Sequence, residues 1–201
     1  MRICIDSSPL LVNSAGVKTY LYHWIQSLRA DPSKGDIRLF PPVNLRILNH
    51  FQKPPWTYPG IASILAVNYS GLPLTDWFTG GSDIFHMSNL IRRAPNGPRI
   101  TATIHDTTAW LFPEMHTVRN AGNDKRFAKD VFTRADGLIA VSQSSRDDAV
   151  RLLGLAPSKI HVIHPGVAPA YFDVTAQAVS RARKFLAAAK PYCLFVGTIE
   201  P

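Results

Sequence analysis

The sequence has few cysteines and no arrangement of them that suggests a structural role. Only Cys4 and Cys193 occur among 201 residues, and they lie near opposite ends of the chain. No CxxC pair or Cys/His cluster accompanies them, which excludes a disulfide scaffold and leaves no motif for a zinc site. Both cysteines lie in apolar runs, so we expect small buried thiols and no disulfide.

Long apolar runs and a leader sequence are also missing. No apolar run reaches the roughly 18 residues that a membrane-spanning helix needs. The opening MRICIDSS has no basic segment followed by a long apolar stretch, so it does not resemble a signal peptide. The hydrophobic fraction of 46% is enough for a full core and excludes general disorder. We expect a folded, cytoplasmic protein with one domain, or one domain and part of a second.

Acidic residues are scarce relative to basic ones. There are 14 Asp and Glu against 22 Lys and Arg, a formal net charge of +8. This balance favours an anionic partner such as nucleic acid, a phosphate-bearing ligand or a membrane surface. The basic residues between Lys125 and Arg134 alternate with acids and lack a dense series of aromatics. Because no helix-turn-helix or RNP-like segment appears either, we expect no nucleic-acid partner.

Short apolar strands alternate with helical patterns along the chain. The periodicity predicts helices over residues 17–28, 61–67, 142–153 and 175–189, with Ser142 as an N-cap and Gly154 as a left-handed stop for the third. We expect an α/β fold, a Rossmann-like, doubly wound and mainly parallel sheet with helices on both faces. The predicted strands are 2–6, 36–40, 44–48, 83–86, 99–105, 137–141, 159–163 and 191–196.

The last part of the chain predicts an incomplete second domain. A parallel strand followed by Gly197-Thr198 normally leads into a loop and a helix, yet the sequence stops at Pro201. We therefore expect a domain over 1–174, a connecting helix over 175–190 and the first strand of a truncated domain over 191–201. The alternative is that this strand closes the first sheet. The connecting helix carries an apolar stripe that we expect to be buried, namely Val179, Ala182, Phe185, Leu186 and Ala189.

Candidate site residues come from the ends of the predicted strands. Ligands of a doubly wound sheet bind outside the carboxyl ends of the strands. Gly16 after the first strand can let a backbone approach a phosphate, or it can serve a simple turn. His105 and Asp106 follow another strand, where they can contact a ligand, or act as a structural histidine and a capping aspartate. His86 and Ser142 end two more strands and can bind sugar hydroxyls, although an N-cap explains Ser142 more simply.

Several motifs of other enzyme classes are absent. No GxSxG elbow and no Walker loop accompany the serines, which disfavours hydrolases and P-loop proteins. The first predicted strand-to-helix turn lacks GxGxxG, and no clear acidic partner for a ribose follows it. A nucleotide-binding dehydrogenase is therefore disfavoured.

Five segments, in order, resemble the N-terminal domain of the glycosyltransferase family 4 (group 1) enzymes, which have the GT-B fold of two facing Rossmann-like domains. The last of them resembles the first strand of the family's donor-binding domain. The segments are Ala15-Gly16-Val17, His105-Asp106 with Phe112-Pro113-Glu114, residues 135–145 (ADGLIAVSQSS), residues 159–167 (KIHVIHPGV) and residues 192–201 (YCLFVGTIEP).

The resemblance implies roles for particular residues. His105 matches the family's cleft histidine close to the donor sugar and is our candidate catalytic residue, with Asp106 holding its loop. Ala15, Gly16 and Val17 would face the cleft between the domains, although the family's frequent Gly-Gly is Ala15-Gly16 here. His86 and Ser142 complete the set of candidate substrate-binding residues.

The resemblance also implies an activity. We expect the acceptor-side half of a retaining glycosyltransferase that moves a sugar from a nucleotide-sugar donor to a glycan or lipid-linked acceptor. It needs no metal and no cofactor, and it lies in the cytoplasm or peripherally at the inner face of the membrane. The family's diphosphate-binding basic pair and Glu-x7-Glu segment belong to the second domain, so we expect this chain alone to be inactive. A GT-B sugar-nucleotide epimerase and a non-catalytic glycan- or membrane-binding domain stay open as alternatives.

Overall fold

The structure is a computed structural model that describes residues 1–12, 16–48, 57–88, 90–168, 171–186 and 193. The chain divides into two compact units, Met1–His164 and Pro165–Pro201. Among the described residues, no helix combines the length and the apolar character needed to cross a bilayer.

The first unit is built on a six-stranded sheet in the order β2-β1-β3-β4-β5-β6. Every neighbouring pair is parallel, which confirms the expected Rossmann-like α/β fold. The chain moves from β1 outward to β2 and then returns to β3 on the other side of β1, so β1 and β3 flank a topological switch point. The strands are β1 (Arg2–Asp6), β2 (Asp36–Phe40), β3 (Ile84–Met87), β4 (Arg99–Ile104), β5 (Gly137–Ala140) and β6 (Ile160–Val162).

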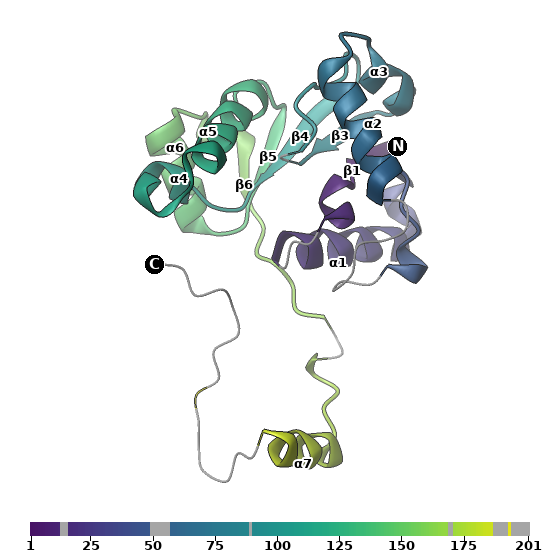
Figure 1. Ribbon diagram of the computed structural model, residues 1–201, viewed down its shortest axis with the longest axis vertical. Coiled ribbons are helices and arrows are strands. Elements are labelled where there is room, and N and C mark those ends of the chain that lie inside the picture. Colours follow the sequence, from purple (N-terminus) through teal and green to yellow (C-terminus); the bar gives the residue numbers. More distant parts are fainter. Residues whose placement is uncertain (13–15, 49–56, 89, 169–170, 187–192, 194–201) are drawn as a thin grey trace. The chain divides into compact units, whose positions relative to one another are not determined.

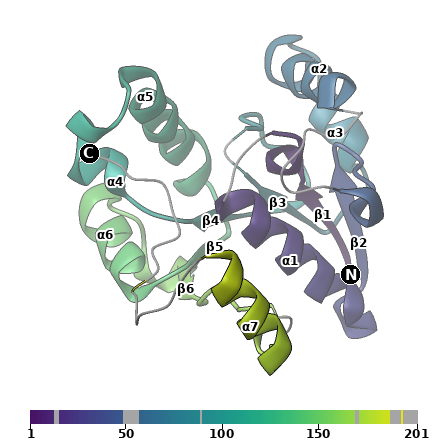
Figure 2. The same ribbon diagram turned by 60° about the horizontal axis from the view of Figure 1, so that its bottom comes forward.

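Helices connect the strands and cover the sheet. Right-handed crossovers that run in opposite directions from a switch point place their helices on opposite faces. Figures 1 and 2 accordingly show α1 on one side of β1 and β3, and α2 and α3 on the other. The helices of this unit are α1 (Gly16–Ala30), α2 (Thr57–Tyr69), α3 (Leu74–Thr79), α4 (Thr108–Leu111), α5 (Val118–Phe127), continued by a π-helical turn η5 (Ala128–Phe132), and α6 (Gln143–Leu153), with 3-10 turns η1 (Ser8–Leu11), η2 (Pro32–Lys34), η3 (Leu45–Ile47), η4 (Pro113–Met115) and η6 (Pro157–Lys159).

The core lies between the sheet and these helices. Central strand residues such as Ile5 and Phe85 are fully buried, and Leu21 and Ile25 pack from α1. Cys4 belongs to this core as predicted, and burial raises the pKa of its thiol to about 12. Cys193 is exposed, so the expectation of a second buried thiol is wrong.

The predicted boundaries of α6 are confirmed by their caps. The Ser142 side chain accepts a hydrogen bond from the backbone N–H of Ser145 at 3.0 Å, which satisfies one of the free N–H groups of the first turn. At the other end Gly154 adopts a left-handed conformation with φ 65°. That conformation is open to glycine because it has no Cβ.

One predicted strand is wrong. The predicted strand over residues 44–48 is replaced by the 3-10 turn η3, and the Asn44 side chain caps this turn by accepting a hydrogen bond from the N–H of Arg46 at 3.0 Å. Such a local side-chain bond replaces the partner that a neighbouring strand would supply. Pro41 and Pro42, which lack an N–H, precede the turn and prevent β2 from continuing into it.

The second unit contains helix α7 (Ala176–Phe185), which begins within one residue of the predicted start of the connecting helix. Thr175 caps it by accepting a hydrogen bond from the N–H of Ala178 at 3.2 Å. None of the residues of α7 is buried, so its apolar stripe is exposed where we expected burial. Ala189, the end of the connecting helix and the predicted strand of the second domain lie outside the described residues, apart from Cys193.

Candidate functional site

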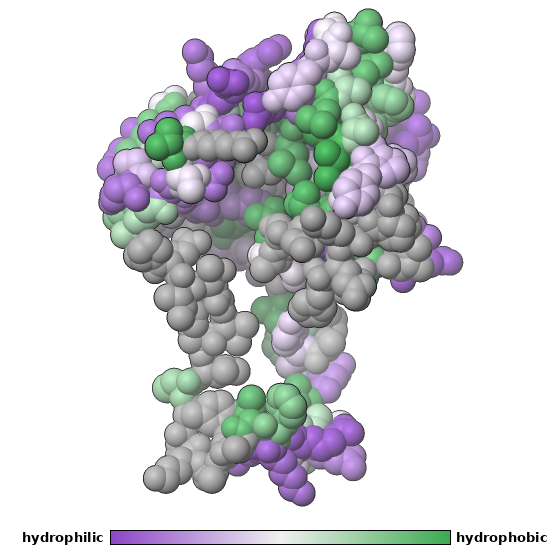
Figure 3. Space-filling model, in the orientation of Figure 1, coloured by the Kyte–Doolittle hydropathy of each residue, from purple (hydrophilic) through white to green (hydrophobic). Residues whose placement is uncertain are grey.

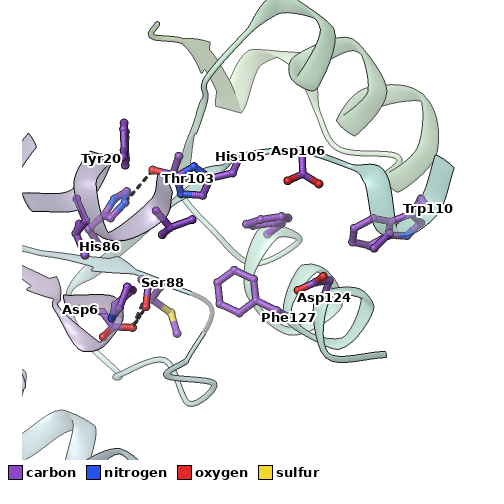
Figure 4. A pocket seen from close by; sticks show the side chains of 16 residues that line it. Asp6, Tyr20, His86, Ser88, Thr103, His105, Asp106, Trp110, Asp124 and Phe127 are labelled. Atoms are coloured by element: carbon purple, nitrogen blue, oxygen red, sulfur yellow. Dashed lines mark hydrogen bonds between the residues drawn. The ribbon is translucent and has the colours of Figure 1, made fainter. Parts of the chain in front are cut away.

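A cavity of about 200 Å³ lies at the carboxyl ends of β1, β3 and β4. It is therefore at the topological switch point, where doubly wound sheets bind their ligands. Figure 4 shows that the polar side chains around the cavity come from several helices and strands. The lining residues are Asp6, Pro9, Val17, Tyr20, Leu21, His86, Met87, Ser88, Thr103, His105, Asp106, Ala109, Trp110, Asp124, Phe127 and Phe132.

His105 lies directly after β4 and lines the cavity. Its ring contacts the Tyr20 ring edge-on, with centroids 5.1 Å apart, and its backbone carbonyl accepts a hydrogen bond from Ser145 Oγ at 3.2 Å. Burial lowers the pKa of this imidazole, and the Asp106 charge only partly opposes the effect. The ring is therefore neutral near pH 7, with one nitrogen able to donate and the other able to accept.

Asp106 lines the cavity and lies two residues before helix α4, whose N-cap is Thr107. Its Oδ1 accepts hydrogen bonds from the backbone N–H of Thr108 at 2.9 Å and from the Thr108 hydroxyl at 2.6 Å. The same hydroxyl lies 3.0 Å from His116 Nε2. The exposed carboxylate thus lines the cavity and also accepts from the first backbone N–H of α4, although the N-cap residue itself is Thr107.

His86 is buried at the base of the cavity. Its Nδ1 lies 2.9 Å from the Thr101 hydroxyl and its Nε2 lies 3.1 Å from the Thr103 hydroxyl, and the Trp24 ring covers it with centroids 4.6 Å apart. Burial, with a smaller contribution from the His105 charge, lowers the pKa of His86 to about 3. With both nitrogens engaged, His86 supports the cavity floor as a neutral ring.

A buried carboxylate that lines the cavity was not among the residues that the sequence singled out. Asp6 is fully buried at the end of β1, where its Oδ1 accepts from the Ser8 N–H at 2.9 Å and its Oδ2 accepts from the Ser88 N–H at 3.2 Å and from the Ser88 hydroxyl. Burial raises the pKa of Asp6, although these hydrogen bonds oppose it. The signal that could have found it is its place as the last residue of a central strand, one strand away from His86.

The loop before α1 is only partly described, because Ala15 lies outside the described residues. Val17 lines the cavity, and Gly16 is exposed beside it. A Cβ added to Gly16 would meet no described atom within 4 Å, so the space in front of this backbone is open. Lys18 is buried and donates from Nζ to the Val12 carbonyl at 3.3 Å, which ties the start of α1 to the end of η1.

Ser142 does not line the cavity. Its hydroxyl caps α6, as the simpler reading of the sequence predicted. The structure thus brings together Val17, His86, His105 and Asp106 from the predicted set, and leaves Ser142 outside the cavity lining.

The wall opposite the strands consists of aromatic and acidic residues that sequence reasoning missed. Phe127 and Phe132 pack edge to face across the junction of α5 and η5, with ring centroids 5.2 Å apart and an angle of 80° between the ring planes. Asp124 precedes them on the same face of α5, and its pKa is raised by burial and by the charge of Asp106, while His116 opposes the rise. A π-helical turn is rare and often marks a functional site, but nothing in the local sequence specifies it.

The described residues contain no group of three or more His, Cys, Asp or Glu side chains that could hold a metal ion. The expectation of a metal-free site stays a prediction.

Solved structures share the fold of this chain. The crystal structure of Anabaena Alr3699/HepE in complex with UDP matches with a TM-score of 0.52 and 17% identity, covering 94% of this chain and 50% of that one. Its complex with UDP-glucose matches with a TM-score of 0.51, 17% identity and the same coverage. The chain thus has the fold of one half of a GT-B glycosyltransferase and spans half the length of these structures.

The family follows from the sequence itself. The model of Glycosyltransferase Family 4 matches residues 14–171, and the chain belongs to this family. A D-inositol 3-phosphate glycosyltransferase from Xylanimonas cellulosilytica is 28% identical, over 45% of this chain and 27% of that protein. The expected family resemblance is therefore confirmed.

Proposed function

We propose that this chain is the N-terminal, acceptor-side domain of a retaining glycosyltransferase of the hexosyltransferase type. It would act with a nucleotide-sugar donor and a glycan or lipid-linked acceptor. The observation that carries the proposal is the cavity at the switch point of the sheet, where the neutral His105 meets Asp106 and Tyr20. The complexes of the HepE structures with UDP and UDP-glucose support a nucleotide-sugar donor.

In this proposal His105 contacts the donor sugar. A neutral imidazole can accept from one hydroxyl and donate to another, so it can hold the sugar in one orientation. The Tyr20 ring packs against the imidazole, and the Ser145 hydroxyl donates a hydrogen bond to the backbone carbonyl of His105. Asp106 keeps the loop in place through Thr108 and presents a carboxylate to the same cavity.

The remaining parts of the mechanism belong to the second domain. Closure of the two domains would exclude water from the donor, and the second domain would stabilise the leaving diphosphate electrostatically in place of a metal. We place the protein in the cytoplasm, with peripheral contact at the inner face of the membrane when the acceptor is lipid-linked.

The test is the His105→Ala variant in a protein that carries the second domain. Loss of a sugar contact made in the transition state is expected to lower kcat/KM by at least about 100-fold, a size typical for a removed polar contact in an active site. Release of nucleoside diphosphate and formation of the glycosylated product are measured together. The matched control is His161→Ala, because His161 is an exposed histidine on β6 outside the cavity.

An unchanged kcat/KM in the His105→Ala variant would remove the assigned role. The products separate the proposal from its alternatives. An epimerase would change the sugar without an acceptor, and a non-catalytic domain would release no nucleoside diphosphate with or without His105.

A further inference from the structure

A second and larger cavity of about 590 Å³ lies between α2 and α5. We call it the α2–α5 groove. Asp124 lines both this groove and the cavity that contains His105. One wall of the groove is apolar and consists of Ile61, Leu65 and Tyr69, and the other is polar and consists of Arg92, Asn123 and Asp124.

The apolar wall is one face of α2. Ile61, Leu65 and Tyr69 follow one another at intervals of four residues, so they form a row along the groove. The core side of the same helix is occupied by other residues, among them the buried Ile64 and Val67. Leu65 is 52% exposed and Tyr69 is 69% exposed, which leaves apolar surface open in the groove. Figure 3 shows hydrophobic residues gathered over α2 and α3, while hydrophilic ones predominate over the part that holds α5.

The polar wall presents a cation held in a fixed position. The Asn68 Oδ1 accepts from the Arg92 N–H at 2.9 Å, and Asn68 Nδ2 donates to the Leu90 carbonyl at 2.9 Å. The Arg92 guanidinium donates from Nη2 to Asn123 Oδ1 at 2.9 Å. No carboxylate of the described residues forms an ion pair with Arg92. Its other donors can therefore bind an anion, and guanidinium suits the oxygens of a phosphate.

Asp124 is the acidic group in the same wall, and its charge opposes an anion. Burial and the nearby charge of Asp106 raise its pKa, so the ionised form is disfavoured relative to a free aspartate. The two charged residues differ in position along the wall. Asp124 borders both the groove and the first cavity, whereas Arg92 borders the groove and not the first cavity.

We propose that the α2–α5 groove binds the acceptor and that the acceptor is an anionic amphiphile, a lipid-linked phosphate. Its phosphate lies at Arg92, its hydrocarbon chain lies along Ile61, Leu65 and Tyr69, and its polar head extends past Asp124 toward His105. Charge complementarity with the net +8 of the chain favours such a ligand over a neutral glycan. The open apolar row favours it over a water-soluble phosphate. The assignment of the ligand as acceptor rests on the proposed function.

The test measures binding to the chain directly by calorimetry, below the micelle concentration of the probe. Farnesyl phosphate carries both chemical groups, farnesol carries the chain alone, and inorganic phosphate and inositol 3-phosphate carry the anion alone. Farnesyl phosphate is expected to saturate at one per chain and to bind at least 10-fold more tightly than any of the other three. Equal binding of inositol 3-phosphate and farnesyl phosphate would overturn the lipid assignment, as would the absence of saturable binding.

Two variants locate the binding. Arg92→Gln removes the charge and is expected to lower the affinity for farnesyl phosphate at least 10-fold without lowering the affinity for farnesol. Leu65→Asp places a carboxylate in the apolar row and is expected to have the same effect on both probes. Leu72→Asp is the matched control, because Leu72 is 51% exposed, close to the 52% of Leu65, but does not line the groove. Leu72→Asp is expected to change affinity less than 2-fold.

Equal losses of affinity in Leu65→Asp and Leu72→Asp would show that the probe adsorbs to the exposed apolar surface, and they would overturn the proposal that it binds in the groove. If Leu65→Asp does not fold, as judged by its urea unfolding transition, Leu65→Ala replaces it with an expected loss of at least 3-fold. Failure here is distinguishable from failure of the proposed function. Transfer to a soluble glycan without farnesyl phosphate binding would overturn the lipid-linked acceptor and leave the glycosyltransferase intact.

Discussion

Two histidines that line the same cavity have different tasks because their surroundings differ. His86 has hydroxyl partners at both nitrogens and is 5% exposed, so it supports the floor. His105 stands at the rim, half-buried, with its ring against Tyr20. Burial lowers the pKa of both, so both are neutral at pH 7. A neutral pair can line a site for hydroxyl-rich ligands without repelling each other.

The depressed pKa of His86 predicts a loss of stability in acid. The unfolded chain binds a proton at this residue below a pKa near 6.5, whereas the folded protein does so only below about 3. The unfolded state therefore gains protons first as the pH falls, and the free energy of unfolding decreases. Between pH 7 and pH 5 this residue accounts for a loss of about 2 kcal/mol.

Urea unfolding of the wild type and of His86→Gln at these two pH values measures the effect. The variant is expected to lose about 2 kcal/mol less than the wild type on going from pH 7 to pH 5. The raised pKa of Asp6 acts in the opposite direction, but it is common to both proteins and cancels in the comparison. An identical pH dependence in the two proteins would contradict a neutral, buried His86. The exposed His161→Gln serves as the control and is expected to follow the wild type.

At the scale of elements, local signals specified where helices begin and end. Ser142 and Gly154 were predicted as the two caps of α6 and are found there. The strand predicted over residues 44–48 is wrong, because Asn44 supplies a local cap that an apolar pattern does not reveal. The π-helical turn after α5 had no local signal at all.

Substitution of two glycines that have open space around them distinguishes the effect of backbone conformation on stability from the effect of packing. A Cβ would meet nothing within 4 Å at either Gly154 or Gly122, but only Gly154 has a positive φ, 65°. Gly154→Ala is expected to lower the free energy of unfolding by about 1 kcal/mol, since the left-handed region penalises a Cβ. Gly122→Ala, inside α5, is expected to raise it by about 0.5–1 kcal/mol. Urea unfolding measures both changes in the free energy of unfolding. Changes of the same sign would refute the assignment of Gly154 as the left-handed residue that ends α6.

At the scale of the whole molecule, the chain spans half the length of the solved structures that it matches. The cavity contains groups that can orient a sugar, but the resemblance places the groups that bind the diphosphate in the other half. A donor held from one side only is neither fixed nor shielded from water.

We therefore predict that the 201-residue chain does not turn over nucleotide sugars. Incubation with UDP-glucose and an acceptor extract is expected to release nucleoside diphosphate no faster than a sample without protein. A protein that includes the second domain is the positive control. Release above background, lost again in the His105→Ala variant, would refute the prediction and would assign the whole active site to this domain.

The sequence by itself determined the alternation of strands and helices, the caps of α6 and the position of His105 and Asp106 at the end of a strand. These features depend on side-chain periodicity and on hydrogen bonds between near neighbours, and both are determined by residues that lie close together in the sequence. The family followed as well, because its segments occur in order along the chain.

Only the tertiary structure decided which strand ends meet. Asp6 and Ser88 are 82 residues apart and share a hydrogen bond because β1 and β3 are neighbours across the switch point. The α2–α5 groove likewise needs the face of one helix and the face of another to approach across the sheet. Strand order and helix packing depend on burial summed over the whole core, so no local stretch of sequence specifies them.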